Sequence, residues 1–308
     1  MMNSNRSSRP RKWLVYTLLV FFLFSVITTS IYLLLYGTDL GITGDEVAVV
    51  YVQGVMLTGS VPAGFGVATS EDVTASLREA DERESVRAIV LRINSPGGSP
   101  AAAEEIVYEM EKIDKPIVVS MGDVAASAAY YISAPADRIL ANPGTTTGSI
   151  GVIWAFQDRT VFYEEEGIEH YIAKSGELKD MGADWRGLTD DEKLYADETI
   201  LEVYNRFIAK VAETRNLSIG EVKEIADGRV YTGKRARELG LVDELGNLYD
   251  AIDTAAELGG IEGRPTITYL NKPSLSKLLF GSEDVRAYTS YYTDNDYGII
   301  SSNLIDLS

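Results

Sequence analysis

The sequence contains no cysteine and a single histidine, His170, among its 308 residues. The absence of cysteine excludes disulfides, thiol nucleophiles and zinc–thiolate sites. One histidine without clustered carboxylates provides no pattern for a metal site, and no cofactor is expected. A serine nucleophile in this chain would need a base other than histidine, and lysine is the residue type that can take that role.

Positive charge is scarce as well. The chain has 28 Lys and Arg against 46 Asp and Glu, a formal net charge of -18. The first 36 residues carry four positive charges and no negative one, so the remainder has a net charge of -22. Nucleic acid is not expected as a partner, because phosphate binding depends on clustered Lys and Arg. The acidic excess either keeps the protein soluble or reflects a saline environment, and composition does not decide between the two.

Charge is absent altogether from residues 13–36, which are rich in Leu, Phe, Val and Ile. A helix of this length measures about 36 Å, enough to cross a bilayer. Arg and Lys precede it and acidic residues follow, which places the N-terminus in the cytoplasm and the rest of the chain outside. A cleaved signal peptide, the alternative, would have a shorter apolar segment and a small-residue cleavage site. We therefore predict a retained single-pass anchor in the cell membrane, in contact with the lipid bilayer.

These observations divide the chain into a cytoplasmic N-terminus at 1–12, a transmembrane anchor at 13–36, a linker at 37–46, one domain at 47–270 and a C-terminal tail at 271–308. Within the domain, apolar runs predict strands at 47–52, 88–93, 116–121 and 138–141. Helical patterns cover 71–82, 100–113, 125–133 and 189–215. Further β segments are predicted at 148–156 and 169–173. Strands that alternate with helices in this way indicate an α/β fold with mostly parallel pairing.

Three segments of this domain contain residues suited to one reaction. Ser127 lies in the run Ala-Ala-Ser-Ala-Ala-Tyr-Tyr, at a strand-to-helix turn where a nucleophile can stand clear of its backbone. Gly97 and Gly98 follow a predicted strand and can expose N–H groups beside a carbonyl. Lys174 and Lys179 lie in one loop and could act as bases if their surroundings favoured the neutral amine. Each segment also has an ordinary reading, as a tight packing contact, a common turn and a solvated loop respectively.

Together the segments resemble the signal peptide peptidase A family of membrane-anchored serine proteases. The resemblance covers roughly 47–258 and rests on five motifs in order: Asn94-Ser-Pro-Gly-Gly98, Ala125-Ala-Ser127-Ala-Ala-Tyr-Tyr131-Ile, Thr147-Gly-Ser149-Ile-Gly-Val152, Lys174-Ser-Gly-x-x-Lys179-Asp180, and Gly228-Arg-Val-Tyr-Thr-Gly233 with Ala236-x-x-Leu-Gly-Leu-Val-Asp243. It implies the Clp protease/crotonase-like fold, a spiral of repeated β-β-α units. It also implies a homo-oligomer, in which a neighbouring subunit could complete each site.

The resemblance assigns a role to each matching residue. Ser127 is the expected nucleophile, and Lys179, 52 residues further along the chain, is the expected general base. Lys174 opens the same motif and is the nearest alternative. Ser149 is expected to help hold the lysine. The backbone N–H groups of Gly98 and Ala128 are expected to form the oxyanion hole; Ala128 and Ala129 replace two glycines common in the family, and Ala128 keeps the donor if its φ is negative.

The Clp protease itself, which uses Ser-His-Asp, is the closest alternative. Its base histidine lies about two dozen residues after the serine, where this chain has Gly148-Ser-Ile-Gly-Val. His170 lies 43 residues after Ser127 and is predicted to be a surface residue. A histidine triad is therefore disfavoured.

The resemblance predicts a serine endopeptidase that degrades cleaved signal peptides in or at the membrane. One alternative is a related Ser-Lys peptidase that acts on another membrane protein, such as a stomatin-like partner. A second is a non-catalytic crotonase-fold binding protein, which gives no reason for Ser127, Ser149 and Lys179 to occur together.

Overall fold

The structure, a computed structural model, describes residues 12–36, 44–59 and 66–272. Most of the predicted linker, at 37–43, and nearly all of the predicted tail, at 273–308, lie outside the described residues. The chain divides into two compact units, Met1–Gly44 and Asp45–Ser308, and each is described by itself.

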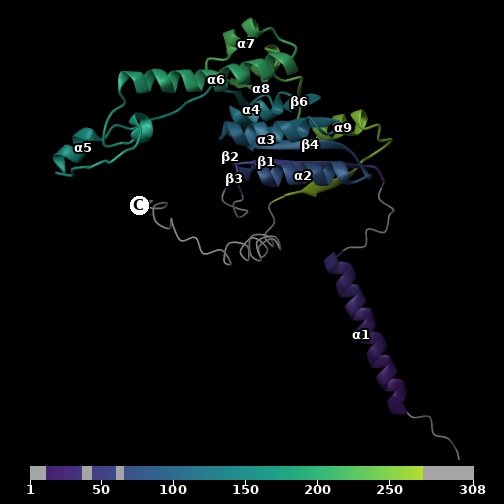
Figure 1. The fold of residues 1–308 in the computed structure, drawn as a ribbon. Coiled ribbons are helices and arrows are strands. Elements are labelled where there is room, and N and C mark those ends of the chain that lie inside the picture. Colours follow the sequence, from purple (N-terminus) through teal and green to yellow (C-terminus); the bar gives the residue numbers. More distant parts are fainter. Residues whose placement is uncertain (1–11, 37–43, 60–65, 273–308) are drawn as a thin grey trace, which may run out of the picture. The chain divides into compact units, whose positions relative to one another are not determined.

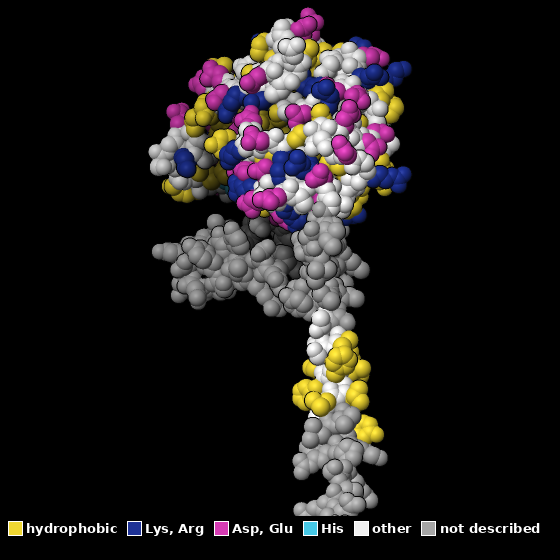
Figure 2. All heavy atoms as spheres, turned by 90° about the vertical axis from the view of Figure 1, so that its right-hand side faces the viewer, with side chains coloured by type: hydrophobic (Ala, Val, Ile, Leu, Met, Phe, Trp, Pro, Cys, Tyr) yellow, Lys and Arg dark blue, Asp and Glu magenta, His cyan; other side chains and the backbone are white. Residues whose placement is uncertain are grey.

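The first unit contains helix α1, Lys12–Tyr36. Its described side chains, at 16–29, are exposed and predominantly apolar (Figure 2). Among the residues that the structure describes, no helix is both long and apolar enough to cross a membrane. The helix predicted at 13–36 is confirmed. Its insertion into a bilayer stays a prediction.

The second unit is built on a sheet whose main strands run in the order β10-β1-β4-β5-β6-β9, all paired in parallel. Strand β7 pairs in parallel with β5, and β8 pairs antiparallel with β7. A second small sheet joins β2 to β3. The strands are β1 (Glu46–Gln53), β2 (Val55–Leu57), β3 (Val67–Thr69), β4 (Val86–Ser95), β5 (Ile117–Ala126), β6 (Arg138–Ala141), β7 (Thr146–Gly148), β8 (Val230–Thr232), β9 (Glu244–Leu245) and β10 (Thr266–Leu270).

Helices cover both faces of this sheet (Figure 1). Successive side chains of a strand point to opposite faces, so Val47 and Val49 pack with α9, whereas Ala48 and Val50 pack in the larger core that includes α2, α3 and α4. Burial of both faces explains why the strands are continuous apolar runs. The helices are α2 (Ser70–Glu82), α3 (Pro100–Met110), α4 (Ala128–Ser133), α5 (Thr160–Glu165), the 3-10 turn η1 (Glu177–Asp180), α6 (Asp190–Thr214), α7 (Ile219–Ile225), α8 (Gly233–Glu238) and α9 (Leu248–Leu258).

The predicted α/β class with a mostly parallel sheet is confirmed. Two local predictions are wrong. The helix predicted from Ala125 begins at Ala128, because Ala125 and Ala126 still pair with β7 as part of β5. The β segments predicted at 148–156 and 169–173 are not strands beyond Gly148. Ser149 and Ile150 still make single backbone hydrogen bonds to Arg229 and Gly228, but no described strand pairs with 152–156 or 169–173.

The surface of the second unit mixes charges of both signs. In the face shown in Figure 2, acidic and basic side chains are interspersed without a basic patch.

Candidate active site

Ser127 occupies the turn between β5 and α4 in a backbone conformation that is rare for a residue with a side chain. Its φ is 56° and its ψ is -126°. Such a conformation costs on the order of 1–3 kcal/mol and persists only where the surroundings impose it. The backbone N–H of Ser127 donates to the Gly148 carbonyl at 2.9 Å, which fixes the turn against β7.

The Ser127 hydroxyl is left available by this geometry. Ser127 is the N-cap of α4, yet its side chain makes no capping hydrogen bond. Ser99, which precedes α3, shows the ordinary arrangement, in which the hydroxyl accepts from the Ala102 N–H at 3.4 Å. The half-buried Ser127 therefore does not use its hydroxyl as a cap, which argues against a purely structural serine.

The Gly97–Gly98 turn lies directly against Ser127. A Cβ added to Gly97 would stand 2.8 Å from the Ser127 Cβ and 2.9 Å from the Ala128 N, so only glycine permits this approach. Gly98 has a φ of 153° and is held against β2, where Met56 donates to the Gly97 carbonyl and accepts from the Ser99 N–H, both at 2.8 Å.

Two backbone donors at this place have no acceptor. Within the described residues, neither the Gly98 N–H nor the Ala128 N–H donates a hydrogen bond. Ala128 is the first residue of α4 and does not have a positive φ. Its N–H therefore stays available as a donor, which was the condition for its expected place in the oxyanion hole. A free pair of N–H groups beside a serine hydroxyl is the arrangement that stabilises a tetrahedral oxyanion.

Ser149 lies beside the Ser127 turn, immediately after β7. It too has a positive φ, 50°, and its N–H donates to the Arg229 carbonyl at 2.9 Å. Gly148 connects the two serines, since its carbonyl accepts from the Ser127 N–H. The structure thus brings together Ser127, Ser149, Gly98 and Ala128, which all line one cavity.

This cavity has a volume of about 620 Å³, within the usual range of small-ligand sites. Its walls away from Ser127 are largely apolar and include Tyr131 and Phe207, whose rings meet edge to face at 5.2 Å. Arg206 and Glu104 form an ion pair at 3.3 Å among the lining residues. The cavity can accept an apolar side chain next to the nucleophile.

Lys179 does not line the Ser127 cavity. It lines a separate hollow of about 320 Å³ together with Lys174, Ser175, Asp180 and Trp185. These residues belong to the segment 152–189 between β7 and α6, which we call the arm; Figure 1 shows α5, within it, apart from the sheet near the start of α6. None of the arm's residues is buried.

The two lysines of the arm differ in their contacts. Lys174 Nζ donates to Asp180 Oδ1 at 2.8 Å and to the Glu177 carbonyl at 2.9 Å. The Lys179 ammonium makes no hydrogen bond or ion pair with any described residue. Lys174 is therefore committed to the arm's own structure, whereas Lys179 is free to act on a group outside it.

His170 is exposed, as predicted. Its ring is stacked on Trp185 at 5.2 Å and meets Tyr163 edge to face at 4.8 Å. It does not line the Ser127 cavity. The histidine is therefore a packing residue of the arm.

Comparison with known proteins identifies the family of this chain. The sequence profile of peptidase family S49 matches residues 109–262, half of the chain, and that of Clp protease matches 52–143. A putative protease of Synechocystis is 38% identical over 208 residues, which cover 67% of this chain and 73% of that protein. The chain belongs to peptidase family S49.

Two further relatives indicate how much of a longer protein the match covers. The putative signal peptide peptidase SppA of Enterococcus faecium is 38% identical over 65% of this chain and 59% of that protein. Protease 4 of Salmonella typhi is 36% identical over 78% of this chain and 39% of that protein. The chain thus spans less than two thirds of the length of either.

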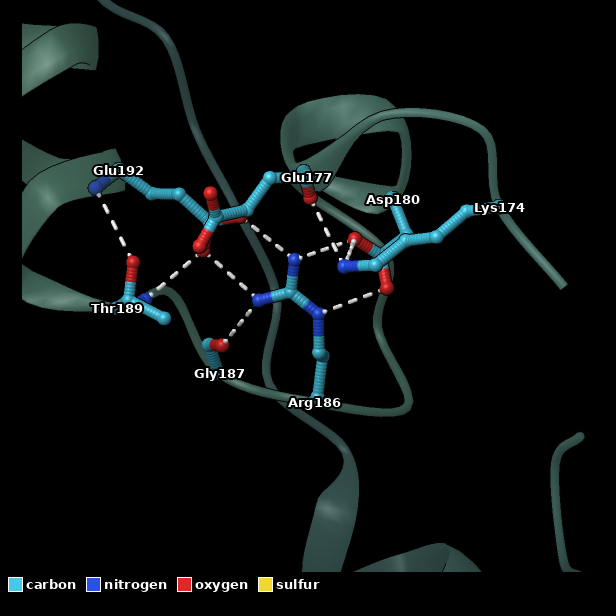
Figure 3. A network of polar contacts seen from close by, with 7 residues as sticks. All are labelled: Lys174, Glu177, Asp180, Arg186, Gly187, Thr189 and Glu192. Atoms are coloured by element: carbon cyan, nitrogen blue, oxygen red, sulfur yellow. Dashed lines mark hydrogen bonds and ion pairs between the residues drawn. The ribbon is translucent and has the colours of Figure 1, made fainter. Parts of the chain in front are cut away.

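Motif reading missed one residue that contacts the segment carrying Lys179, the arginine Arg186. Arg186 joins Asp180, next to Lys179, to Glu192 at the start of α6 (Figure 3). No periodicity marks an arginine in a loop. The nearby Thr189-x-x-Glu192 capping pattern could have placed the helix start, but not the ion pair across it.

Proposed function

We propose that this protein is a serine endopeptidase with a Ser-Lys dyad formed by Ser127 and Lys179. The observation that carries the proposal is the uncapped Ser127 hydroxyl in a strained turn, beside the free N–H groups of Gly98 and Ala128. Membership of family S49 supports the reaction class. Peptide-bond cleavage needs a nucleophile and an oxyanion site in this arrangement.

The reaction begins with neutral Lys179 taking the proton of Ser127 as Oγ attacks the substrate carbonyl carbon. The N–H groups of Gly98 and Ala128 hold the oxyanion. Lys179 then returns the proton to the amine nitrogen as the carbon–nitrogen bond breaks. Water, deprotonated by the same lysine, hydrolyses the acyl-serine. Ser149, which lies beside Ser127, holds the lysine through its hydroxyl.

In this proposal the lysine comes from a second copy of the chain. The Ser127 cavity and the Lys179 hollow share no lining residue, and only the cavity is lined by residues of α6. Arg186 ties Asp180 of the hollow to Glu192, and the first α6 residue of the cavity is Ile200. The eight residues between Glu192 and Ile200 rise about 12 Å along the helix, beyond the reach of a lysine side chain. The arm also exposes large apolar side chains, Ile153 by 91% and Tyr171 by 94%, which a neighbouring subunit would cover.

The substrate we propose is a signal peptide left in the membrane after cleavage, and α1 is the anchor that keeps the enzyme there. The apolar cavity beside Ser127 suits the apolar side chains of such a peptide. The relative from Enterococcus faecium is named as a putative signal peptide peptidase. The uncharged run at 13–36, folded as a helix, supports anchoring with the catalytic domain outside the cytoplasm.

The direct test uses the full chain in detergent micelles with a synthetic signal peptide as substrate. Mass spectrometry should show internal cleavage next to apolar residues. A serine-directed phosphonate probe should label one site, Ser127. Absence of both cleavage and labelling would refute the peptidase function, whereas cleavage of soluble peptides alone would refute only the proposed substrate.

Completion of the site by a second copy predicts complementation. Chains with Ser127→Ala and chains with Lys179→Ala should each be inactive, but mixed assemblies of the two should recover activity. Equal amounts that mix at random give about a quarter of the wild-type number of working sites. Co-expression with two affinity tags and a rate measurement on the doubly purified complex provide the test. A mixed complex without activity would contradict the proposal that the lysine comes from a neighbour.

Gly98→Ala is expected to lower the rate of cleavage by roughly 10²–10³-fold, the effect of losing one oxyanion donor. A Cβ at this position would meet the Met56 carbonyl oxygen at 2.1 Å, and the φ of 153° is strained for alanine, so the turn and its N–H must move. Gly144→Ala is the matched control, because nothing lies within 4 Å of its added Cβ. A folded Gly98→Ala protein with the wild-type rate would remove Gly98 from the oxyanion hole.

A further inference from the structure

One arginine joins the end of the turn that carries Lys179 to the start of α6. Arg186 Nη2 donates to Asp180 Oδ1 at 2.7 Å and Nε donates to Asp180 Oδ2 at 3.2 Å. On its other side, Nη1 and Nη2 donate to the two oxygens of Glu192 at 2.8 and 2.6 Å. Nη1 also donates to the Gly187 carbonyl at 3.1 Å, so all three guanidinium nitrogens are engaged (Figure 3).

Both carboxylates that Arg186 binds are themselves fixed. Glu192 accepts from the Thr189 N–H at 2.9 Å, as part of the capping box that begins α6. Asp180 ends η1 and accepts from Lys174. Arg186 therefore connects the 3-10 turn to the first turn of a 25-residue helix. Lys179 sits in the turn that is held in this way, and its own ammonium remains unengaged by any described residue.

The network is shielded from water in a segment that has little else to hold it. The side chain of Asp180 is only 10% exposed, although no residue of the arm is buried as a whole, and the side chain of Glu192 in α6 is only 4% exposed. Shielded ion pairs add little net stability, because the desolvation of the charges offsets their attraction. Bidentate contacts on both sides do, however, define one geometry for the turn.

The charges of the network balance one another beside the lysine. In the hollow that Lys179 lines, the other charged residues are Lys174 and Asp180; Arg186 and Glu192 lie next to them, Glu177 is on η1, and His170 stacks on the Trp185 ring. Hydrogen bonds from Arg186 and then Lys174 hold the pKa of the Asp180 carboxyl well below its usual range. Hydrogen bonds from Arg186 lower the pKa of Glu192 to about 2. Both groups are thus carboxylates at any working pH, offset by two cations.

We infer that Arg186 is a positioning residue for the catalytic base: it fixes the turn that presents Lys179 and cancels the charge of the carboxylate beside it. The inference rests on the proposed function of Lys179. Without Arg186 the uncancelled carboxylate favours the ammonium form of Lys179, which cannot accept the serine proton.

The sign of the pH response separates this role from simple support of the fold. Arg186→Gln removes a positive charge, so the pH midpoint of kcat/KM should move up by roughly half a unit, which alone lowers the rate about threefold at neutral pH. Release of the turn that presents Lys179 should bring the total loss to about tenfold or more. Glu192→Gln removes a negative charge, so its midpoint should move down. Arg186→Lys keeps the charge and should keep the midpoint, but with a lower rate because an ammonium cannot bind both carboxylates bidentately.

The matched control is Arg159→Gln, which removes an exposed arginine of the same arm that lies 3.8 Å from Asp184 and beside Tyr163, outside the Arg186 network. It should match the wild type in rate and midpoint. Equal behaviour of the Arg186→Gln and Arg159→Gln proteins would overturn the inference. So would midpoints that move in the same direction for Arg186→Gln and Glu192→Gln, because a structural role has no dependence on the sign of the charge.

Mixed assemblies show whether Arg186 acts in the chain that supplies the lysine or in the chain that supplies the serine. Arg186→Gln should impair cleavage when placed on the chain that carries Ser127→Ala and supplies the lysine. It should have no effect on the chain that carries Lys179→Ala and supplies the serine. An equal effect in both chains would overturn the inference while leaving the peptidase function intact. A wild-type protein without cleavage would instead refute the proposed function itself.

Discussion

Ser127→Ala is expected to abolish peptide cleavage, with kcat/KM lowered by at least about 10³-fold, while the protein folds and assembles as the wild type does. The change removes the attacking oxygen, and the two free N–H groups supply only a residual rate without it. The hydroxyl makes no capping hydrogen bond. The unfolding temperature should therefore be unchanged, because no capping interaction is lost.

The measurement is the initial rate on a fluorogenic peptide, together with labelling by a serine-directed probe. Ser218→Ala is a suitable control, since it removes a serine that caps α7 and lies outside the Ser127 cavity. That protein should keep both labelling and rate. Cleavage at the wild-type rate by the Ser127→Ala protein would show that another residue is the nucleophile.

The second large effect is expected for Lys179→Ala, which should lose cleavage nearly as completely as the serine variant. Lys179 is the arm lysine with no bond to a described residue, and a general base must be free to accept a proton. Lys174→Ala should retain part of the activity, because it loses an ion pair with Asp180 and no reacting group. Rates for the two variants side by side decide between the lysines.

The reverse order, with full activity in Lys179→Ala and loss in Lys174→Ala, would identify Lys174 as the base. The pH profile supplies an independent check. Activity should rise toward alkaline pH, because only the neutral amine accepts the serine proton. A plateau that begins near pH 6 would indicate His170 instead.

Several elements could be predicted from the sequence because their signals are local. The strands at 47–52, 88–93 and 116–121 are apolar runs, and the structure buries them on both faces of one sheet. The helix at 189–215 begins with a capping box at Thr189, which is readable without any partner. Local signals of this kind need no knowledge of distant residues.

The predictions of strands at 148–156 and 169–173 were wrong because strand formation depends on a partner that is distant in the sequence. A β-rich composition favours a strand only where a neighbour offers unpaired backbone groups. The arm runs through solvent without such a neighbour, so its residues stay irregular or form the short helix α5. Motif reading also did not find the Arg186 ion pairs, because they join an irregular loop to a helix and follow no periodic pattern.

The residue types in the sequence were enough to predict a reaction class: a serine among small residues, a loop with two lysines, a pair of glycines and almost no histidine. These residue types and their order along the chain were enough to predict the reaction, because its chemistry depends on which side chains are present. The arrangement of these residues in space came from the fold. It joins Ser127 to Gly98, Ala128 and Ser149 in one cavity, engages Lys174 with Asp180, and leaves Lys179 free in a separate hollow. These outcomes depend on contacts between distant segments and on ion pairs within an irregular loop, for which a linear pattern carries no signal.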